Sequence, residues 1–410
     1  MIQAGIGTSR DKDPYQAGYT AAKMAVEKAS GTKTDAPAPD FLFAFASPAL
    51  NQEEVVRGIR DAAGHAPLLG CSTAGEITNE GPTQKSVSVM AIRSDRISFY
   101  TGLGRDIKAG AREAGQAAAR ETQGKAATVS GPRGALRAFI MLPDVLTGNG
   151  ADIVRGVSDI LGPHFPVVGG AAGDDFMFEK TYEYRDDEVV SGAVAGVGLS
   201  GDFTIGIGVR HGWVPIGMPM KVTKAKGAVL FELDGKPAIS LYEDYFGARA
   251  DELRKEALAR LAITYPLGLK IPEYQEEYLI RDPITVNADG SITCAAEIPE
   301  GSEVRLMIGS KEKAVEAAQD AARHLMKEFE LDKTKPKFVL MFNCIAREKL
   351  FAQNANDEIQ AVMEIIGPDV PLLGFYTYGE QAPLGGEVRN LEKCDPRFYN
   401  ETVVMFAVGE

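Results

Sequence analysis

Three short segments of the chain are apolar at every position, and segments with helical periodicity lie on both sides of each. The apolar runs are residues 41–45, 138–142 and 338–342. A run of five apolar residues is typical of a strand that is covered on both of its faces. We therefore predict three buried strands in sheets that carry packed helices.

The segment after each apolar run has the spacing of an amphipathic helix. In the third copy the apolar residues recur at i, i+3, i+4 and i+7. These positions are Ile359, Val362, Met363 and Ile366. In the first copy, Asn51 with Glu54 three residues later fits an N-cap with a capping box. A glycine is predicted to end each helix, at Gly64, Gly162 or Gly367.

A helix rich in alanine is expected before each apolar run, because small residues recur there on one face. The stripes lie within residues 22–29, 111–118 and 314–321. A helix with such a face sits close against a sheet. Each apolar run is therefore predicted to lie between two helices in the chain, as in β-α-β connections.

A turn with two glycines recurs nearly three times after these helices. Residues 67–76 and 371–380 share an apolar run, a glycine, polar or aromatic residues, a second glycine and a glutamate, and residues 166–174 are a shorter copy. Strand-like segments follow each turn. An internal repeat of about 100 residues constrains the whole architecture. We expect an α/β fold of mixed sheets with helices packed on them, built from three β-α-β-α-β-like pseudo-repeats.

Residues 211–302 match none of the three units and form an insertion before the last one. The Asp-Gly pair within residues 287–290 predicts a hairpin, and a helix is expected at residues 251–263. We predict a domain at 1–210 with two units, and a domain at 211–410 with the insertion and the third unit. The insertion is either a lid or partner surface or a structural addition, and the sequence leaves both open.

The chain of 410 residues is acidic, with a formal net charge of −13. Nucleic acids and anionic membranes bind basic surfaces, so this balance argues against both as partners. No apolar run reaches the roughly 18 to 20 residues of a membrane helix, and the first residues lack the pattern of a signal peptide. The cysteines have no CxxC spacing, which argues against a zinc site and a disulfide frame. We expect a cytoplasmic protein without a bound metal.

The recurring turns are the first candidate ligand site. Exposed backbone N–H groups and polar side chains in such turns would form a small polar pocket. The candidate ligand-binding residues are Ser72, Thr73, Glu76, Asp174, Tyr376, Tyr378 and Glu380. In the alternative interpretation the glycines serve tight packing and each carboxylate caps a turn or a helix.

A second candidate site follows the third apolar run directly, where strands of α/β folds commonly border ligand crevices. Arg347 would bind a ligand carboxylate through two N–H groups, with Asn343 and Cys344 beside it. Alternatively, Arg347 pairs with a nearby acid and Cys344 is an inert core residue. An enzyme with Cys344 or Cys71 as nucleophile is a less favoured hypothesis, because the thiolate needs a base and the chain has only four histidines.

The third candidate is the segment that contains Trp213, the only tryptophan of the chain. Trp213 would form the wall of a ligand pocket, and His211 would bind a metal or a haem. The favoured alternative is an aromatic side chain packed at a domain junction. We expect no cofactor, with haem on His211 as the alternative.

Four segments together resemble the FIST family, which pairs a FIST N-terminal domain with a FIST C-terminal domain. They are residues 70–76, 211–217, 343–347 and 374–380, in the order expected for the family. The resemblance implies a cytoplasmic sensory module in signal transduction that binds a small ligand, usually proposed to be an amino acid. Some members resemble haem-based nitric-oxide sensors. Catalysis is not expected.

The resemblance also implies a partner, because this chain shows no fused kinase or chemotaxis segment. Output would go to a separate signalling protein such as a histidine kinase or a chemotaxis component. The leading hypothesis is an amino acid or similar small carboxylate that binds Arg347, with Glu380 or Glu76 taking its ammonium group. The sequence leaves open whether the three turns form one pocket, and it does not name the ligand.

Overall fold

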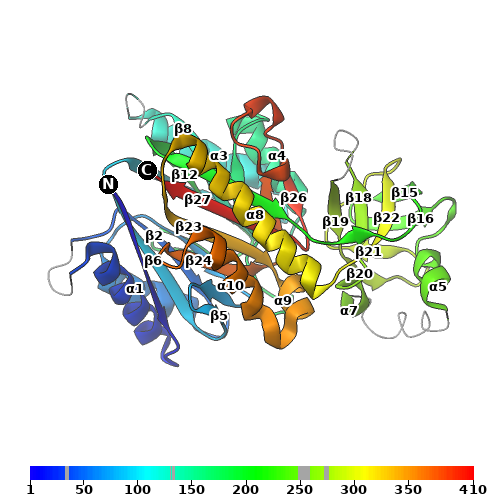
Figure 1. The fold of residues 1–410 in the computed structure, drawn as a ribbon, viewed down its shortest axis with the longest axis horizontal. Helices are drawn as coiled ribbons and strands as arrows, with labels where there is room; N and C mark the ends of the chain where they lie inside the picture. Colours follow the sequence, from blue (N-terminus) through cyan, green and yellow to red (C-terminus); the bar gives the residue numbers. More distant parts are fainter. Residues whose placement is uncertain (33–36, 130, 132–133, 248–258, 272–276) are drawn as a thin grey trace.

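The computed structural model describes residues 1–32, 37–129, 131, 134–247, 259–271 and 277–410 (Figure 1). A larger body contains both ends of the chain, and a smaller domain built from the middle of the chain lies at one side of it. In the part that is described, the body contains three sheets of six strands each.

Each sheet of the body takes four of its strands from one unit of the chain. The first unit contains β1 (Ile2–Ser9), β2 (Phe41–Ala46), β3 (Leu68–Ser72) and β6 (Val87–Ser94); the second contains β7 (Ile97–Gly104), β8 (Leu136–Pro143), β9 (Val167–Gly170) and β12 (Val194–Gly201); the third contains β13 (Thr204–Arg210), β23 (Pro336–Cys344), β24 (Leu372–Thr377) and β27 (Val403–Gly409). The strand orders are β1-β6-β2-β3, β7-β12-β8-β9 and β13-β27-β23-β24. In each sheet one parallel pair lies beside antiparallel pairs, so the predicted α/β fold with mixed sheets is confirmed.

The two remaining strands of each sheet are contributed by another unit. Three short hairpins make this exchange: β4 (Glu76–Thr78) with β5 (Gly81–Thr83), β10 (Glu183–Arg185) with β11 (Glu188–Val190), and β25 (Glu380–Pro383) with β26 (Pro396–Tyr399). The first unit adds β4 to β24, the second adds β10 to β3, and the third adds β25 to β9. The exchange is cyclic, so no unit has a complete sheet without another.

A pair of helices covers the outer face of each sheet. The pairs are α1 (Pro14–Ser30) with α2 (Gln52–Ala63), α3 (Ala111–Ala127) with α4 (Gly150–Leu161), and α8 (Lys311–Asp332) with α10 (Ala355–Ile366). Asn51 Oδ1 accepts a hydrogen bond from the amide of Glu54 at 3.1 Å, which confirms the predicted N-cap. The three predicted terminal glycines, Gly64, Gly162 and Gly367, follow α2, α4 and α10 with positive φ.

Alternate residues of the central strands enter two different cores, as the pleat of a strand requires. Phe41, Phe43 and Phe45 of β2 belong to a core shared by the inner faces of the three sheets. Leu42 and Ala44 pack under α1 and α2. The predicted burial on both faces is therefore correct, and the second cover is another sheet rather than a helix.

The small domain is formed by the insertion between β13 and α8. Its described strands are β14 (Val214–Pro215), β15 (Met220–Lys226), β16 (Val229–Leu233), β17 (Lys236–Pro237), β18 (Leu267–Lys270), β19 (Tyr278–Arg281), β20 (Pro283–Val286), β21 (Ile292–Cys294) and β22 (Glu303–Ile308), and its described helices are α5 (Ser240–Phe246) and α7 (Ala259–Ala262). β20 and β21 form the predicted hairpin around Gly290. Most of the helix predicted at 251–263 lies outside the described residues.

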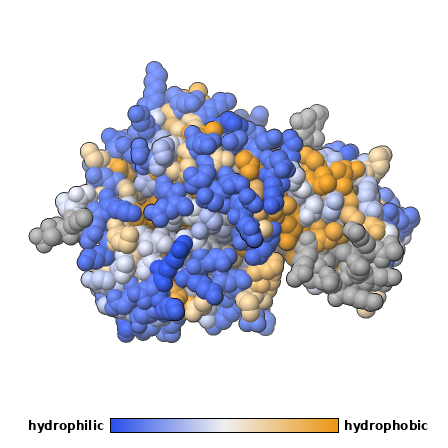
Figure 2. Space-filling model, turned by 60° about the horizontal axis from the view of Figure 1, so that its bottom comes forward, coloured by the Kyte–Doolittle hydropathy of each residue, from blue (hydrophilic) through white to orange (hydrophobic). Residues whose placement is uncertain are grey.

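Short helical segments complete the third unit: α9 (Ile345–Phe351), η3 (Ala352–Asn354), η4 (Leu384–Gly386) and η5 (Leu391–Lys393). Within the described ranges, no helix has the length and apolar content to cross a membrane. Figure 2 shows apolar surface where the small domain borders the body. On the small domain the exposed apolar side chains include Val214, Ile216 and Met218.

Candidate functional site

The three recurring turns meet inside the body. Each pair of turns is joined by a hydrogen bond: Ser72 Oγ donates to the carbonyl oxygen of Gly173 at 2.7 Å, the amide of Ala74 to that of Tyr376 at 3.1 Å, and the amide of Ala171 to that of Gly379 at 2.7 Å. The turns therefore form one junction, which we call the turn junction. Whether they meet was the question that the sequence left open.

Three glutamates occupy the same place in the three exchanged hairpins. Glu76 is the register partner of Phe375, Glu183 of Cys71 and Glu380 of Gly170. Each of these three partners directly follows a glycine of the repeated strand. The glycines are Gly70, Gly169 and Gly374. Glu183, rather than the predicted Asp174, is thus the counterpart of Glu76 and Glu380.

Glu183 was missed because it lies nine residues after Asp174, outside the repeated motif. A weak signal for it exists in the sequence. Glu76 bonds Ser86, ten residues later, and Glu183 accepts from the amide of Ala193, also ten residues later, each directly before a long strand. The third copy breaks this spacing, because Glu380 reaches the amide of Thr402.

Each of these glutamates accepts a hydrogen bond from a nearby threonine and is fully buried. The distances are 2.6 Å from Thr73 Oγ1 to Glu76, 3.1 Å from Thr181 Oγ1 to Glu183 and 2.7 Å from Thr377 Oγ1 to Glu380. Burial raises the pKa of Glu76 to about 8 and also raises the pKa of Glu183 and Glu380. Among the described residues these glutamates have no ion-pair partner, and their burial favours the protonated form of each.

Asp174 organises the loop that leaves the second turn. Its carboxylate accepts from the amides of Phe178, Glu179 and Lys180 at 2.6 to 2.9 Å, and from the hydroxyl of Tyr378. The loop runs through left-handed conformations at Asp175, Phe176 and Phe178. Such backbone is costly for residues other than glycine, and the bonds to Asp174 hold it in place.

Arg347 is fully buried and is paired within the protein. Its Nε donates to Glu358 at 2.9 Å and its Nη2 to the same oxygen, while Nη1 donates to the carbonyl of His211 and Nη2 to that of Ala314. Asn343 Nδ2 also donates to Glu358, at 2.8 Å. A ligand carboxylate would have to displace Glu358 in order to bind Arg347. Binding of a ligand carboxylate by Arg347 therefore stays a prediction.

The predicted site residues of the third unit divide between the two faces of its sheet. Phe342 and Phe375 face the central core, so alternation puts Asn343 and Tyr376 on the face covered by α10, and Cys344 and Thr377 on the inner face. On the α10 face the Asn343 Oδ1 and the Tyr376 hydroxyl have no hydrogen-bond partner among the described residues. These two atoms therefore have hydrogen-bonding capacity left for a ligand on the α10 face.

Trp213 packs where the body meets the small domain, beside Ile280 and Met307, and the guanidinium of Arg347 lies 5.6 Å from its ring. Its Nε1 donates to the carbonyl of Ile263 at 3.1 Å. His211 Nδ1 accepts the amide of Trp213 at 3.0 Å, and burial, with the charge of Arg347, lowers the pKa of His211 to about 4. That bond occupies Nδ1 only, so haem on His211 stays a prediction.

The cysteines are free thiols within the folded chain, and all four are buried. Burial raises the pKa of Cys71 and Cys344, and raises the pKa of Cys294 and Cys394 to about 12. A nucleophilic cysteine needs the opposite shift. Every predicted ligand-binding residue is at most 7% exposed, so the turn junction is closed rather than open to solvent.

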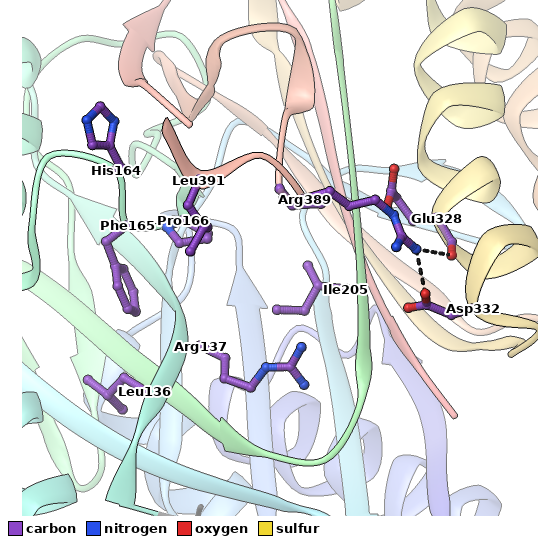
Figure 3. Close-up of a pocket in the computed structure, with 11 residues that line it drawn as sticks. Leu136, Arg137, His164, Phe165, Pro166, Ile205, Glu328, Asp332, Arg389 and Leu391 are labelled. Atoms are coloured by element: carbon purple, nitrogen blue, oxygen red, sulfur yellow. Dashed lines mark hydrogen bonds and ion pairs between the residues drawn. The ribbon is translucent and has the colours of Figure 1, made fainter. Parts of the chain in front are cut away.

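An open cavity of about 420 Å³ lies between the second and third units (Figure 3). We call it the Arg137 groove. Its apolar walls include Leu136, Phe165 and Ile205, and its charged residues are Arg137 at the start of β8, Glu328 and Asp332 on α8, and Arg389 after β25. The sequence did not single out these residues, because they come from distant segments without a shared motif.

On one side of the Arg137 groove Glu328 and Asp332 are paired with Arg389, and Arg137 lies on the other side. Asp332 Oδ1 accepts from Arg389 Nη2 at 2.6 Å and its Oδ2 from Thr204 Oγ1 at 3.1 Å; these bonds, with the charge of Arg137, hold the pKa of Asp332 low. Arg137 Nη1 donates to the carbonyl of Phe203. In Figure 3 the Arg137 guanidinium points into the cavity and is joined to no other residue drawn there.

Proteins similar to this chain include proteins of Mycobacterium tuberculosis, Mycobacterium bovis and Methanocaldococcus jannaschii. MT0656 of Mycobacterium tuberculosis is 25% identical over 409 residues, covering 94% of this chain and 96% of its own length. Mb0898c of Mycobacterium bovis is 24% identical over 399 residues, with 94% and 95% covered. MJ1623 of Methanocaldococcus jannaschii is 30% identical over 180 residues, 41% of this chain and 35% of that one. All three are named as uncharacterised proteins.

Solved structures give only distant similarity. A cyanuric acid hydrolase from A. caulinodans aligns over 99% of both chains with 8% identity and a TM-score of 0.37. T. maritima PurL complexed with ADP aligns over 100% of this chain and 71% of its own, with 10% identity and a TM-score of 0.23. Scores this low support no statement about fold or chemistry.

The family domains match nearly the whole chain. The FIST N domain matches residues 40–236 and the FIST C domain residues 238–383. The two matches meet at β17, in the sheet of the small domain. The domain boundary predicted from the sequence, at 210, stays a prediction. The chain therefore belongs to the FIST family, whose domains are associated with sensory modules of signal transduction.

Proposed function

We propose that this protein is a sensory module that binds a small zwitterion, an amino acid or a similar small carboxylate, in the Arg137 groove. The observation that carries the proposal is the placement of an exposed guanidinium and a carboxylate on opposite sides of one cavity with apolar walls. An amino acid has the same three parts, which are a carboxylate, an ammonium group and a side chain.

Arg137 takes the ligand carboxylate in this proposal, because a guanidinium binds a carboxylate through two parallel N–H donors. Asp332 takes the ammonium group. The ligand side chain lies against Phe165 and Ile205. The cavity of about 420 Å³ is within the range of small-molecule sites. The ligand class is the one expected from the sequence, and its site moves from Arg347 and Glu380 to this groove.

The groove lies between elements of two units, so occupancy would couple them. Arg137 belongs to β8 of the second unit, and Asp332 belongs to α8 of the third. A ligand that bridges them binds one relative placement of the units better than another, which is the requirement for a ligand to shift a conformational equilibrium. A separate signalling protein, such as a histidine kinase or a chemotaxis component, would receive the output.

Calorimetric titration of the full chain with single amino acids tests this proposal. Arg137→Gln and Asp332→Asn should each weaken binding of the responding amino acid by about tenfold or more, since a hydrogen bond to a charged group contributes about 1.5–3 kcal/mol. Two exposed ion-paired residues outside the groove provide matched controls. Arg112→Gln and Asp320→Asn should leave affinity unchanged.

Unchanged affinity in Arg137→Gln and Asp332→Asn, with loss of binding in Glu380→Gln, would return the ligand to the turn junction. A response to no amino acid at millimolar concentration would reject the ligand class itself.

A further inference from the structure

One joint between the small domain and the body is made by two consecutive residues, Arg281 and Asp282. The buried guanidinium of Arg281 donates to the carbonyl oxygens of Glu297 at 2.8 Å and of Phe398 at 3.3 Å. Phe398 is in β26 of the body, whereas Arg281 ends β19 of the small domain. Asp282 follows directly and faces the body at Glu401.

Glu401 is an unusual residue for its position. It lies in the turn between β26 and β27 with a φ of 54°, a left-handed conformation that residues other than glycine rarely adopt. Its side chain is 0% exposed. Neither of its carboxyl oxygens has a conventional hydrogen-bond donor among the described residues, and the same holds for Asp282 Oδ1. The carboxyl group of Glu401 instead lies within hydrogen-bonding reach of the carboxyl group of Asp282.

Two carboxylates at such a distance cannot both carry a charge in a buried place without compensation. Arg347 is already paired with Glu358, and the single charge of Arg281, which binds neutral backbone carbonyls, balances only one of the two carboxylates. Glu380 adds a third acid to the surroundings of Glu401. In the described ranges no group of side chains has the arrangement of a metal site. A proton held between the two groups is the simplest charge balance.

We propose that Asp282 and Glu401 share one proton, and that this carboxyl–carboxylate bond is a latch that holds the small domain against the body. Loss of the proton leaves two negative charges in contact, and repulsion between them opens the joint. Through this latch, the pH determines whether the small domain is held against the body. It is independent of ligand binding in the Arg137 groove.

The titratable surroundings favour retention of the proton. Burial, and then the proximity of Asp282, raises the pKa of Glu401, and burial raises the pKa of Asp282 to about 6. Arg281 and Arg347 act against this shift, whereas Glu380 supports it. Tyr242 and Cys344 also face the pair and are neutral, because burial raises the pKa of both. The shared proton is therefore present near neutral pH and leaves on the alkaline side.

Trp213 is a built-in reporter of this joint. It clusters with Ile280, two residues before Asp282, and Leu350 of the body packs against this cluster. It is the only tryptophan of the chain, so its emission reports this location alone. Opening of the joint should expose the ring to water and shift its emission to longer wavelength.

The experiment is a pH titration of Trp213 emission between pH 6 and 10 in the full chain. The wild type should show a reversible red shift below the pH of global unfolding, with the open fraction rising about tenfold per pH unit at its onset, as expected for one linked proton. Glu401→Gln and Asp282→Asn should each remove the step, because an amide donates to the remaining carboxylate at every pH. Two variants are used so that, if one of them fails to fold, the other still tests the proposal.

Glu76→Gln is the matched control. Glu76 is also fully buried with a raised pKa, but it belongs to the exchanged hairpin of the first unit, so its variant should keep the Trp213 step. A wild type without a step, or a step that persists in both latch variants, overturns the proposal. Stoichiometric metal in the purified protein, with a Trp213 shift on chelation at pH 7, would overturn it in favour of a bound cation.

Discussion

Arg347 donates through Nε and Nη2 to one oxygen of Glu358, and both side chains are fully buried. Arg347 follows β23, while Glu358 lies on α10, so the pair ties that helix to the end of the strand. Its remaining bonds reach the carbonyls of His211, directly after β13, and of Ala314 in α8, so they lie on either side of the small domain in the chain. One guanidinium thus joins three parts of the third unit.

Removing one member of this pair should destabilise the protein strongly. Arg347→Met leaves the buried Glu358 carboxylate without its cation, and an uncompensated buried charge typically costs about 3–5 kcal/mol. Urea unfolding of the variant should show this loss. The double variant Arg347→Met/Glu358→Leu should lose clearly less than the sum of the single variants, and strict additivity would contradict the coupling.

Glu76 makes the stability of the fold depend on pH. The folded chain keeps its proton up to a pKa of about 8, whereas an unfolded glutamate loses it near about 4.3. The stabilising contribution is therefore fully present below about pH 4.3 and is lost as pH rises through about 8. Glu76→Gln should flatten the fall in unfolding free energy by about 1.4 kcal/mol per pH unit between these limits.

Chemical unfolding at several pH values measures that slope. Ser86→Ala removes a hydrogen-bond donor to Glu76 without removing the titrating group, and it should keep the wild-type slope. A Glu76→Gln slope equal to that of the wild type would show that the carboxyl is ionised in the folded protein.

The hydroxyl of Tyr378 is expected to hold the strained loop after the second turn. It donates to Asp174 and accepts from the amide of Phe176 at 2.8 Å. Tyr378→Phe leaves both groups short of a partner, at a cost of about 1–3 kcal/mol. Hydrogen exchange of the Phe176 amide should accelerate while exchange in β2 stays slow. Unchanged protection of that amide would place the control of the loop elsewhere.

The close packing of α3 on β7 requires a glycine at position 104. A Cβ at Gly104 of β7 would overlap the carbonyl oxygen of Ala114 on α3, so Gly104→Ala should destabilise the fold and lower Tm. Gly124 on the same helix is exposed, and among the described residues no atom lies within 4 Å of a Cβ placed there. Gly124→Ala should stabilise by up to about 1 kcal/mol; equal effects of the two changes would contradict this account.

The thiols should react slowly in the folded protein. All four cysteines are buried and have raised pKa values, so iodoacetamide should label them only after denaturation. Rapid labelling of Cys71 or Cys344 at neutral pH would instead revive the hypothesis of a cysteine nucleophile.

The hydrophobic pattern predicts the three central strands and their neighbouring helices correctly, because burial and helix capping depend on residues close together in the chain. Asn51 and Gly64 mark the ends of α2 by local chemistry alone. For the same reason, residues 41–45 could be predicted as a strand buried on both faces. The pattern did not show that one of these faces packs against another sheet rather than a helix.

The tertiary structure decided where the polar residues lie. Only strand register makes Glu183 the counterpart of Glu76, and only the meeting of β23 with α10 gives Arg347 its partner Glu358. The Arg137 groove likewise gathers residues that are far apart in the chain, such as Arg137 and Arg389. Local sequence sets which segments form strands and helices, while long-range pairing and packing set which side chains become neighbours.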